Sequence, residues 1–464
     1  MANLTKPPID RFRTDNKTTK TELISAGAYN CSELMLGRLI SDDTGGSIFH
    51  EAVDLRLHTN SYSITQSLSD NNITLVIRVA DSLRMLERLG SKGLQGEEFV
   101  KCKIQSPKRE NKDEIIDLLF YVVYIGDVTI GDNNSNEAFD LVCVTKEKLL
   151  SDLSIVNRHF KETETEIVKN IFSNNIQNSP KAKQLKAIDQ FKDRTLFTTT
   201  PPSIGIEDII IPGLNPMSAF DFLARRAFGG SSLGSYFEFF ENSKGFYFAN
   251  IEQLINLNKG RGAVFNHNPA QHLAVTHDST YYRHIEVLGD IKMPSTANRL
   301  INGTLSHSVR KLDYIKKKHN DIKFNMKDLY DSFEQTGKFN LTDKFFDAFA
   351  NEQPYEYTVL TDPTASEDHV EHIVGKRLAY MDMLNSYQLQ IVVYGDTGLN
   401  VGDVISINLP EPGSHEKKST DSLYSGFWFV TGVKHSFDAS KMNTTLNLSK
   451  SGLNEPHTDN PSGD

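Results

Sequence analysis

Histidines are the residues of this chain whose type and spacing first suggest chemistry. His267, His272 and His277 follow one another at five-residue steps, and His369 and His372 stand three apart beside acidic residues. A zinc site needs ligands that converge from a rigid frame. Five-residue steps do not place side chains on one helix face, and the second group does not form the His-Glu-x-x-His zinc pattern. The histidines are therefore predicted to be solvated loop residues.

Other patterns that could carry catalysis are equally incomplete. The glycine-rich stretch 229–234 lacks the Lys-Ser or Lys-Thr of a phosphate loop. Glu97 and Glu98 are neighbours, so on a strand they point to opposite faces and cannot work as an acid/base pair. The run Lys316 to Lys318 is typical of a solvated face rather than a DNA site. The sequence predicts no enzyme, and no catalytic, cofactor-binding or metal-binding residues.

Composition limits the class of protein. The chain has 464 residues, of which 38% are hydrophobic and 24% charged, with a net charge of −10. That length allows about three domains, and the acidic balance argues against a nucleic-acid clamp. Cys31, Cys102 and Cys143 lack metal spacing and are predicted to be free thiols in strands. No apolar stretch is long enough to predict a membrane span or a signal core.

The most legible structural signal lies in residues 388–450. Ile405, Ile407 and Leu409 alternate with polar residues, which is the pattern of a strand with one dry face. Gly402 followed by Asp403 is expected to form the turn on which the register of this region depends, because glycine permits positive φ and aspartate can cap a turn. The stretch is predicted to be a small antiparallel barrel whose structural turn and barrel residues are Gly395, Gly402, Asp403, Trp428 and Gly432.

Other elements are expected upstream. Alternation predicts strands at 73–79 and 99–104, a continuous apolar run predicts a fully buried strand at 120–125, and strands are also expected at 284–288 and 299–306. Helices are predicted at 81–89, after a Thr163 cap, and after an Asn215 cap with Pro216 at the first helical position. A hairpin is predicted across 236–248.

Several segments, in this order, resemble the T4-type central hub proteins of contractile phage tail baseplates, a hub and VgrG-like tube-domain family. They are 73–81, 94–100, 139–144, 160–168, 211–227, 239–248 and 395–448. The resemblance extends over about four-fifths of the chain, and residues 305–375 depart from it. It implies an α+β, β-rich, multidomain fold with two small antiparallel β-barrel (tube) domains and inserted α/β domains.

The domain boundaries implied are a flexible arm at 1–20, a first β-barrel tube domain at 21–148, a helical connector domain at 149–205, a helix plus hairpin of the second tube domain at 206–255, an inserted α/β region at 256–375, the C-terminal part of the second tube domain at 376–452, and a flexible tail at 453–464.

The function implied by the resemblance is structural. A homotrimer would act as a symmetry adapter that joins the hexameric tail tube to the trimeric central spike protein and lines the channel through which viral DNA passes. Other baseplate proteins would be further partners, and the virion tail baseplate, assembled in the host cytoplasm, would be its location. Lumen-facing strands are expected to be acidic or neutral, because contacts between phosphates and Lys or Arg would slow DNA.

Two alternatives remain open at this point. One is a secretion-system spike that acts as a VgrG-like binding module, which would be expected to carry a long repetitive β-helical extension, whereas this sequence ends at Asp464. The other is a metal-dependent cell-wall hydrolase, which a zinc assay would detect.

Overall fold

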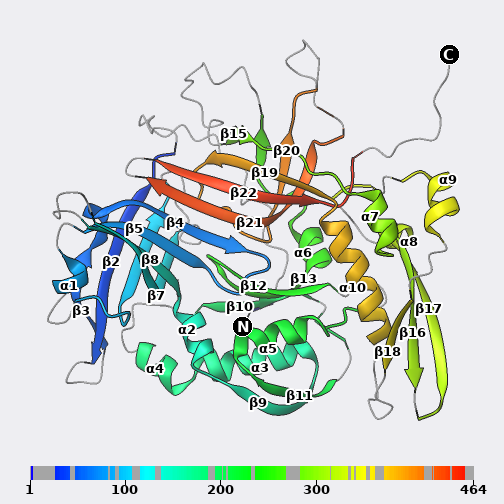
Figure 1. Ribbon diagram of the computed structural model, residues 1–464, viewed down its shortest axis with the longest axis horizontal. Coiled ribbons are helices and arrows are strands. Elements are labelled where there is room, and N and C mark those ends of the chain that lie inside the picture. The colour runs from blue at the N-terminus through cyan, green and yellow to red at the C-terminus, as the bar shows by residue number, and fades with distance from the viewer. Residues whose placement is uncertain are drawn as a thin grey trace.

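The computed structural model shows a β-rich α+β chain in which one large curled sheet lies beside several smaller sheets and helices (Figure 1). This confirms the predicted fold class. The residues described are 2–3, 27–41, 47–81, 84–88, 93–106, 115–130, 137–186, 194–200, 202–204, 207–230, 236–267, 283–313, 315–332, 336–338, 341–351, 356–360, 370–411, 421, 423–438 and 441–454.

The large sheet has thirteen strands from two distant parts of the chain. The N-terminal half supplies β2 (Asn30–Ser41), β3 (Ser47–Asp54), β4 (Thr59–Ser67), β5 (Thr74–Asp81), β6 (Phe99–Gln105), β7 (Ile116–Ile130) and β8 (Glu137–Thr145). The C-terminal half supplies β14 (Val264–Asn266), β15 (Ile285–Leu288), β19 (Tyr387–Tyr394), β20 (Val404–Asn408), β21 (Gly426–Asp438) and β22 (Met442–Lys450). The strands assigned by sequence to two barrels therefore belong to one continuous sheet.

The two halves meet where β21 pairs antiparallel with β4, from Gly432 opposite Ser67 to Asp438 opposite Ser61. At one end of this seam the rings of Tyr62 and Phe437 stack with centroids 4.5 Å apart. Such cross-strand pairs stabilise the pairing of strands, so the seam is a built contact within the sheet.

Alternating apolar residues account for the strands of each half. In β5, Leu75, Ile77 and Val79 are fully buried while their neighbours are partly exposed, which is the pattern that a one-sided sheet requires. All three cysteines are free thiols, and those of Cys102 and Cys143 lie in the same core. Burial of these apolar side chains determines which face of the sheet packs against the core.

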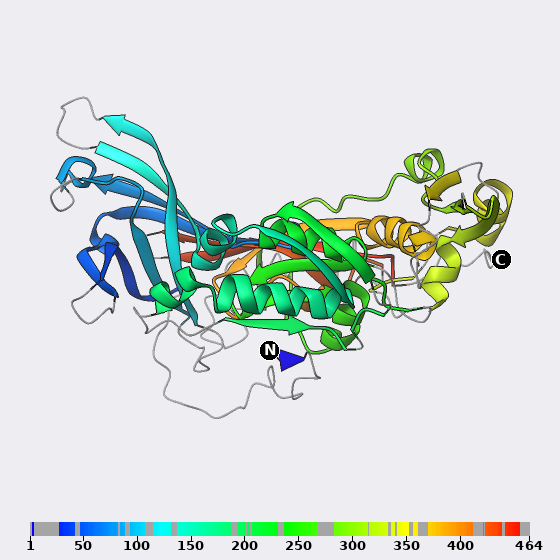
Figure 2. The same ribbon diagram turned by 90° about the horizontal axis from the view of Figure 1, so that it is seen from below.

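Three smaller sheets and most of the helices lie on one side of the large sheet and at one of its ends (Figure 1 and Figure 2). The four-stranded sheet consists of β1 (Ala2–Asn3), β10 (Thr195–Thr198), β13 (Gly245–Asn250) and β12 (Phe237–Asn242). The two-stranded sheet consists of β9 (Val156–Glu162) and β11 (Glu207–Leu214). The three-stranded sheet consists of β17 (Lys318–Asn325), β16 (Ser306–Asp313) and β18 (Glu356–Leu360). The α-helices are α1 (Met85–Arg88), α2 (Lys146–Asp152), α3 (Glu164–Ile171), α4 (Pro180–Lys186), α5 (Pro216–Ala224), α6 (Ile251–Asn258), α7 (Thr296–Ile301), α8 (Met326–Ser332), α9 (Asp343–Phe345) and α10 (Val370–Leu384).

Both predicted helix caps are confirmed. The Thr163 side chain accepts a hydrogen bond from the Glu166 backbone N–H at the start of α3, and the Asn215 side chain accepts one from Ser218 at the start of α5. Pro216 occupies the first turn of α5, where its missing N–H has no helical partner to lose.

Two expected elements are wrong in part. The strand at 120–125 is not fully buried, because Val123 is 57% exposed and Tyr124 is 59% exposed beyond a bulge in β7. Residues 299–301 of the strand expected at 299–306 belong to α7, whose cap is the Ser295 side chain, and the strand β16 begins only at Ser306. Local capping chemistry overrides the β-propensity of this short segment.

The three-stranded sheet lies beside a small core of Leu305, Met326, Phe346 and Ala350, while Leu329 of α8 packs into the core of the large sheet. In the ranges described, no helix is both long and apolar enough to cross a membrane. The expected N-terminal arm and C-terminal tail fall almost wholly outside the described residues.

Candidate functional site: the buried junction between the halves of the sheet

Two polar segments meet between the halves of the large sheet, and together they are called the buried junction. The first is the loop 395–403 between β19 and β20, which is buried from 395 to 402. The second is the turn 241–245 that joins β12 to β13. Loops ordinarily lie on the surface, because a buried loop must find partners for its backbone N–H and C=O groups. The junction is therefore described by the hydrogen-bond partners of its buried backbone and side-chain groups.

The loop is tied to the N-terminal half of the sheet at the end of β6. Ser106 and Thr397 exchange hydrogen bonds: the Ser106 N–H donates to the Thr397 hydroxyl at 3.2 Å, and the Thr397 N–H donates to the Ser106 hydroxyl at 2.9 Å. The Val401 N–H donates to the Gln66 side chain of β4 at 3.4 Å. Residues about 290 positions apart thus share reciprocal buried bonds, which hold only in one geometry.

The same loop is tied to the C-terminal half. The Gly402 N–H donates to the Val430 carbonyl at 3.0 Å, and the Val430 N–H donates to the Asp403 carbonyl at 2.9 Å. The Asp403 carboxylate accepts a bond from the Asn400 N–H at 2.9 Å. These bonds link the turn to the middle of β21, the strand that pairs with β4.

The five structural residues expected from the sequence are all in the C-terminal half. Gly402 has φ +91°, and a Cβ there would lie 3.1 Å from the Phe240 ring and 3.2 Å from Leu254. Gly395 and Asp403 lie at the two ends of the buried loop, and Gly432 follows a bulge in β21. Trp428 is fully buried, and its indole N–H donates to the Tyr424 carbonyl at 3.0 Å. That the register depends on Gly402 and Asp403 stays a prediction.

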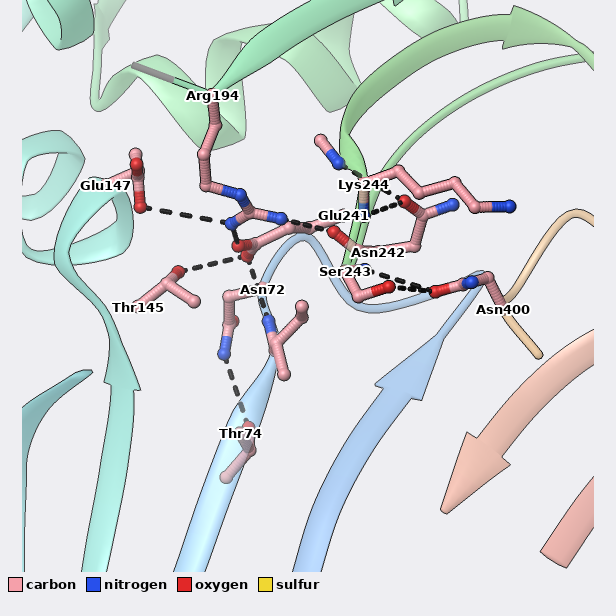
Figure 3. Close-up of polar contacts among 12 residues, drawn as sticks. Asn72, Thr74, Thr145, Glu147, Arg194, Glu241, Asn242, Ser243, Lys244 and Asn400 are labelled. Atoms are coloured by element: carbon pink, nitrogen blue, oxygen red, sulfur yellow. Dashed lines mark hydrogen bonds and ion pairs between the residues drawn. The ribbon is translucent and has the colours of Figure 1, made fainter. Parts of the chain in front are cut away.

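A fully buried carboxylate, Glu241, begins the second segment (Figure 3). It accepts hydrogen bonds from the Ile73 N–H at 2.9 Å and from the Thr145 hydroxyl at 3.0 Å, both in the N-terminal half of the sheet. Its ion pair is with Arg194, just before β10. One side chain of the hairpin thereby joins two other parts of the chain.

Arg194 is surrounded by acceptors and by an aromatic face. Besides Glu241 it donates to the Asn242 carbonyl, lies 3.9 Å from the Glu147 carboxylate and stacks over the Phe246 ring at 4.8 Å. Burial raises the pKa of Glu241 to about 7, although Arg194 opposes this shift and Glu147 adds to it. The carboxyl is therefore close to its titration point near neutral pH.

The hairpin turn and the buried loop are joined to each other. The Asn242 amide donates to the Val401 carbonyl at 3.1 Å, and the Ser243 hydroxyl donates to the Asn400 side-chain oxygen at 2.5 Å (Figure 3). Asn400 is itself fully buried and donates to the Gly398 carbonyl at 3.1 Å. The junction is thus one network that contacts both halves of the sheet and, through Arg194, the start of β10.

His435 of β21 belongs to the edge of this network. It is fully buried, and its Nδ1 lies 3.0 Å from the Thr444 hydroxyl, which also accepts the Asp396 N–H at 3.2 Å. Burial lowers the pKa of His435 to about 4. The ring is therefore neutral at physiological pH and acts as a packed hydrogen-bonding group.

The arrangement supports a structural role rather than bond-making chemistry, because Glu241 is enclosed on every side by protein groups. Sequence reasoning missed Glu241, Arg194, Ser106 and Asn400, since no local spacing relates residues that meet only in the folded chain. Among the described residues, no three His, Cys, Asp or Glu side chains gather as metal ligands. His267 stacks near His284 at 6.4 Å, whereas His272, His277 and His369 lie outside the described residues.

The sequence matches no known protein family profile and no curated protein. Solved structures similar to the chain include the tail protein from Neisseria meningitidis MC58, with 13% identity over 92% of this chain and 98% of that chain and a TM-score of 0.49. Another is the 43 kDa tail protein of prophage MuSo2 from Shewanella oneidensis, with 9% identity over 90% and 98% of the two chains and a TM-score of 0.48.

A third is an E. coli component of the type VI secretion system, itself described as similar to T4 bacteriophage tail proteins. It shares 10% identity over 85% of this chain and 73% of that chain, with a TM-score of 0.39. By their descriptions, these three are two phage tail proteins and one type VI secretion component.

Proposed function

We propose that this chain is the structural hub of a contractile phage tail baseplate, a non-enzymatic homotrimer that joins a hexameric tail tube to a trimeric central spike. The strands of residues 21–148 would form one tube unit of each protomer, and those of 376–452, with contributions from 206–255, would form the other. Three copies would then present six similar units around a channel for viral DNA.

The observation that carries this proposal is the continuous sheet that runs through both halves of the chain. A three-to-six symmetry adapter needs two sheet units per protomer at a fixed mutual angle, because closed cyclic assemblies repeat one contact geometry around the ring. The pairing of β4 with β21 supplies the link between the units, and the buried junction supplies bonds that resist a change of angle.

Exposed apolar side chains give the proposal further support. On β7, beyond its last pairing with β6 at Tyr121, three large apolar residues are at least half exposed: Val123, Tyr124 and Val128. A projecting ribbon with an apolar surface is poorly stabilised in water by itself, and exposed apolar patches commonly mark interaction sites. In an assembly protein such a surface would be buried against a partner, whereas in an isolated monomer it would stay exposed to water.

The test is the mass and shape of the purified protein. One chain has a mass of 52.2 kDa, so light scattering is expected to give about 157 kDa for a trimer. Negative-stain images should show a ring with six lobes. A stable monomer at about 10 µM, with the spike protein of the same tail present, would contradict the proposal.

The secretion-system alternative differs in what the same ring would hold. A hub is expected to co-purify with a separate trimeric spike protein and with tail tube protein, so co-expression with those two partners separates the readings. Binding of a secreted toxin by the ring, with no affinity for tail tube, would favour the VgrG-like module.

A further inference from the structure

The hairpin of β16 and β17 has a charge opposite to that of the rest of the molecule. Residues 306–325 contain six Lys or Arg and two Asp, a net charge of +4, so the remaining residues carry −14. The hairpin extends away from the large sheet at the end of the molecule where α10 lies (Figure 1).

The basic charge gathers at the tip of this hairpin, which is called the basic tip and comprises Ile315 to Lys318. All four residues are exposed, and Ile315 is 62% exposed. Of the three lysines, Lys316 lies 3.6 Å from the Asp313 carboxylate. Lys317 and Lys318 form no ion pair with any acidic residue in the part of the chain that the structure describes. The tip therefore offers two uncompensated cations beside an apolar side chain.

The basic tip is also held in one conformation. The Asp313 carboxylate accepts bonds from the Ile315 N–H at 3.1 Å and from the Lys316 N–H at 2.8 Å. Lys317 has φ +51°, one of only two positive values among the described non-glycine residues. A side-chain cap and a left-handed residue fix the turn, and a fixed turn loses less entropy when it binds.

Ion pairs elsewhere in the same sheet leave the tip as its cationic end. Arg310 forms a bidentate pair with Asp321, both bonds at 2.8 Å, and a further pair with Glu356 at 2.7 Å. The charges in the middle of the sheet thus neutralise one another. The edge strand β17 carries one further exposed lysine, Lys323, whereas Ile315 to Lys318 place three lysines in succession at the tip.

We propose that the basic tip docks against the acidic surface of a second copy of this chain. The tip is cationic while the residues outside the hairpin carry a net charge of −14, so opposite charges are available for the contact, and the exposed isoleucine supplies apolar area. Nucleic acid is disfavoured as the partner, because non-specific DNA binding depends on many phosphate contacts and the tip offers only three lysines. This inference rests on the proposed homotrimer, and it gives the β16–β17 hairpin a role in the contact between its protomers.

The test measures self-association of the full chain by sedimentation velocity between about 50 and about 500 mM NaCl. The dissociation constant of the wild type is expected to rise with salt. K317E/K318E should raise it at least about tenfold at low salt, because like charges then face each other, and should remove most of the salt dependence. K317Q/K318Q should act in the same direction with a smaller effect, and circular dichroism shows whether each variant is folded.

The matched control is K161E/K183E, which makes the same change of net charge at two exposed lysines outside the hairpin. It should leave the dissociation constant within about twofold of the wild type. An equal loss of association in the control would overturn the proposal, because net charge rather than the tip would then be the cause.

Other outcomes overturn the proposal in distinguishable ways. A trimer that K317E/K318E leaves unchanged removes the role of the tip and leaves the hub function standing, whereas a wild-type monomer at every salt concentration removes both. Irreversible aggregation of K317E/K318E would assign the lysines to edge protection. Binding of a 30-base-pair duplex (about three helical turns) by the wild type but not by K317E/K318E, with association unchanged, would assign the tip to nucleic acid.

Discussion

At the buried junction, Glu241 has no solvent exposure and every partner it has is protein. In the β16–β17 hairpin, Asp321 forms a bidentate pair with Arg310, but its side chain is 41% exposed. Both sites join a carboxylate to a guanidinium, and they differ most in burial. The comparison teaches that the same pair can fix an internal geometry in one place and merely balance surface charge in another.

The difference follows from desolvation. A buried pair that loses one partner leaves an uncompensated charge in a medium of low dielectric constant, whereas an exposed pair exchanges its partner for water. Mutations at the junction should therefore change folding, and mutations in the hairpin should change association. Each prediction below separates these two outcomes.

The largest effect is expected from Glu241→Ala. This change leaves Arg194 buried without its carboxylate and removes the acceptor of the Ile73 N–H and the Thr145 hydroxyl. The free energy of unfolding should fall by about 3–5 kcal/mol. Urea denaturation followed by circular dichroism measures it, and fluorescence of Trp428, the single tryptophan of the chain, reports the C-terminal half separately.

Glu241→Gln is the matched control, since it keeps the shape and one acceptor oxygen. Its cost should be clearly smaller than that of Glu241→Ala. If Glu241→Ala were as stable as the wild type, the junction would not hold the halves together, and the comparison with the hairpin would fail.

The junction also shows how far the sequence leads. Alternation predicted β5 and β6, and cap residues predicted the starts of α3 and α5, because both depend on neighbours in sequence. The reciprocal bonds between Ser106 and Thr397 involve residues 291 positions apart, and nothing local in either segment indicates the other. The sequence pattern likewise did not predict that both halves share one sheet, since strand pairing between distant segments leaves no periodic signal.

Gly402→Val is expected to have the next largest effect. A β-branched residue at φ +91° is strained, and its side chain would also crowd Phe240 and Leu254. The free energy of unfolding should fall by about 2–4 kcal/mol, as measured by the same urea denaturation.

Gly260→Ala separates strain from crowding. Gly260 has φ +77°, and a Cβ there would meet nothing within 4 Å, so only backbone strain of about 1 kcal/mol is expected. Equal costs at Gly402 and Gly260 would show that the buried loop tolerates added atoms and that its packing does not fix the junction.

The pH dependence of stability should depend on Glu241. Its pKa is about 7 in the folded chain and has an ordinary value of 4.5, so between these values the folded state binds the proton that the unfolded state has lost. Stability from this group is fully present below pH 4.5 and is lost as pH rises through 7, by on the order of 1 kcal/mol per pH unit.

His435 acts in the opposite sense. Its pKa is lowered from 6.5 to about 4, so its stabilising contribution is present above pH 6.5 and is lost as pH falls towards 4. The two groups therefore offset each other in the wild type. Glu241→Gln should remove one of them, so that stability rises more steeply from pH 5 to pH 6.5 than in the wild type. Parallel curves for the two proteins would show that Glu241 does not titrate in this range.

The smallest effect is expected from Asp321→Asn in the hairpin. The pair with Arg310 is exposed to solvent, and Arg310 keeps Glu356 as a partner, so the urea midpoint should not change measurably. The same change raises the net charge of the hairpin from +4 to +5. If the basic tip docks on an acidic surface, association at low salt should tighten by about twofold, opposite in sign to the effect of K317E/K318E. A clear loss of folding stability with no change in association would place Asp321 with Glu241 as a structural group, and burial would then not be what separates the two regions.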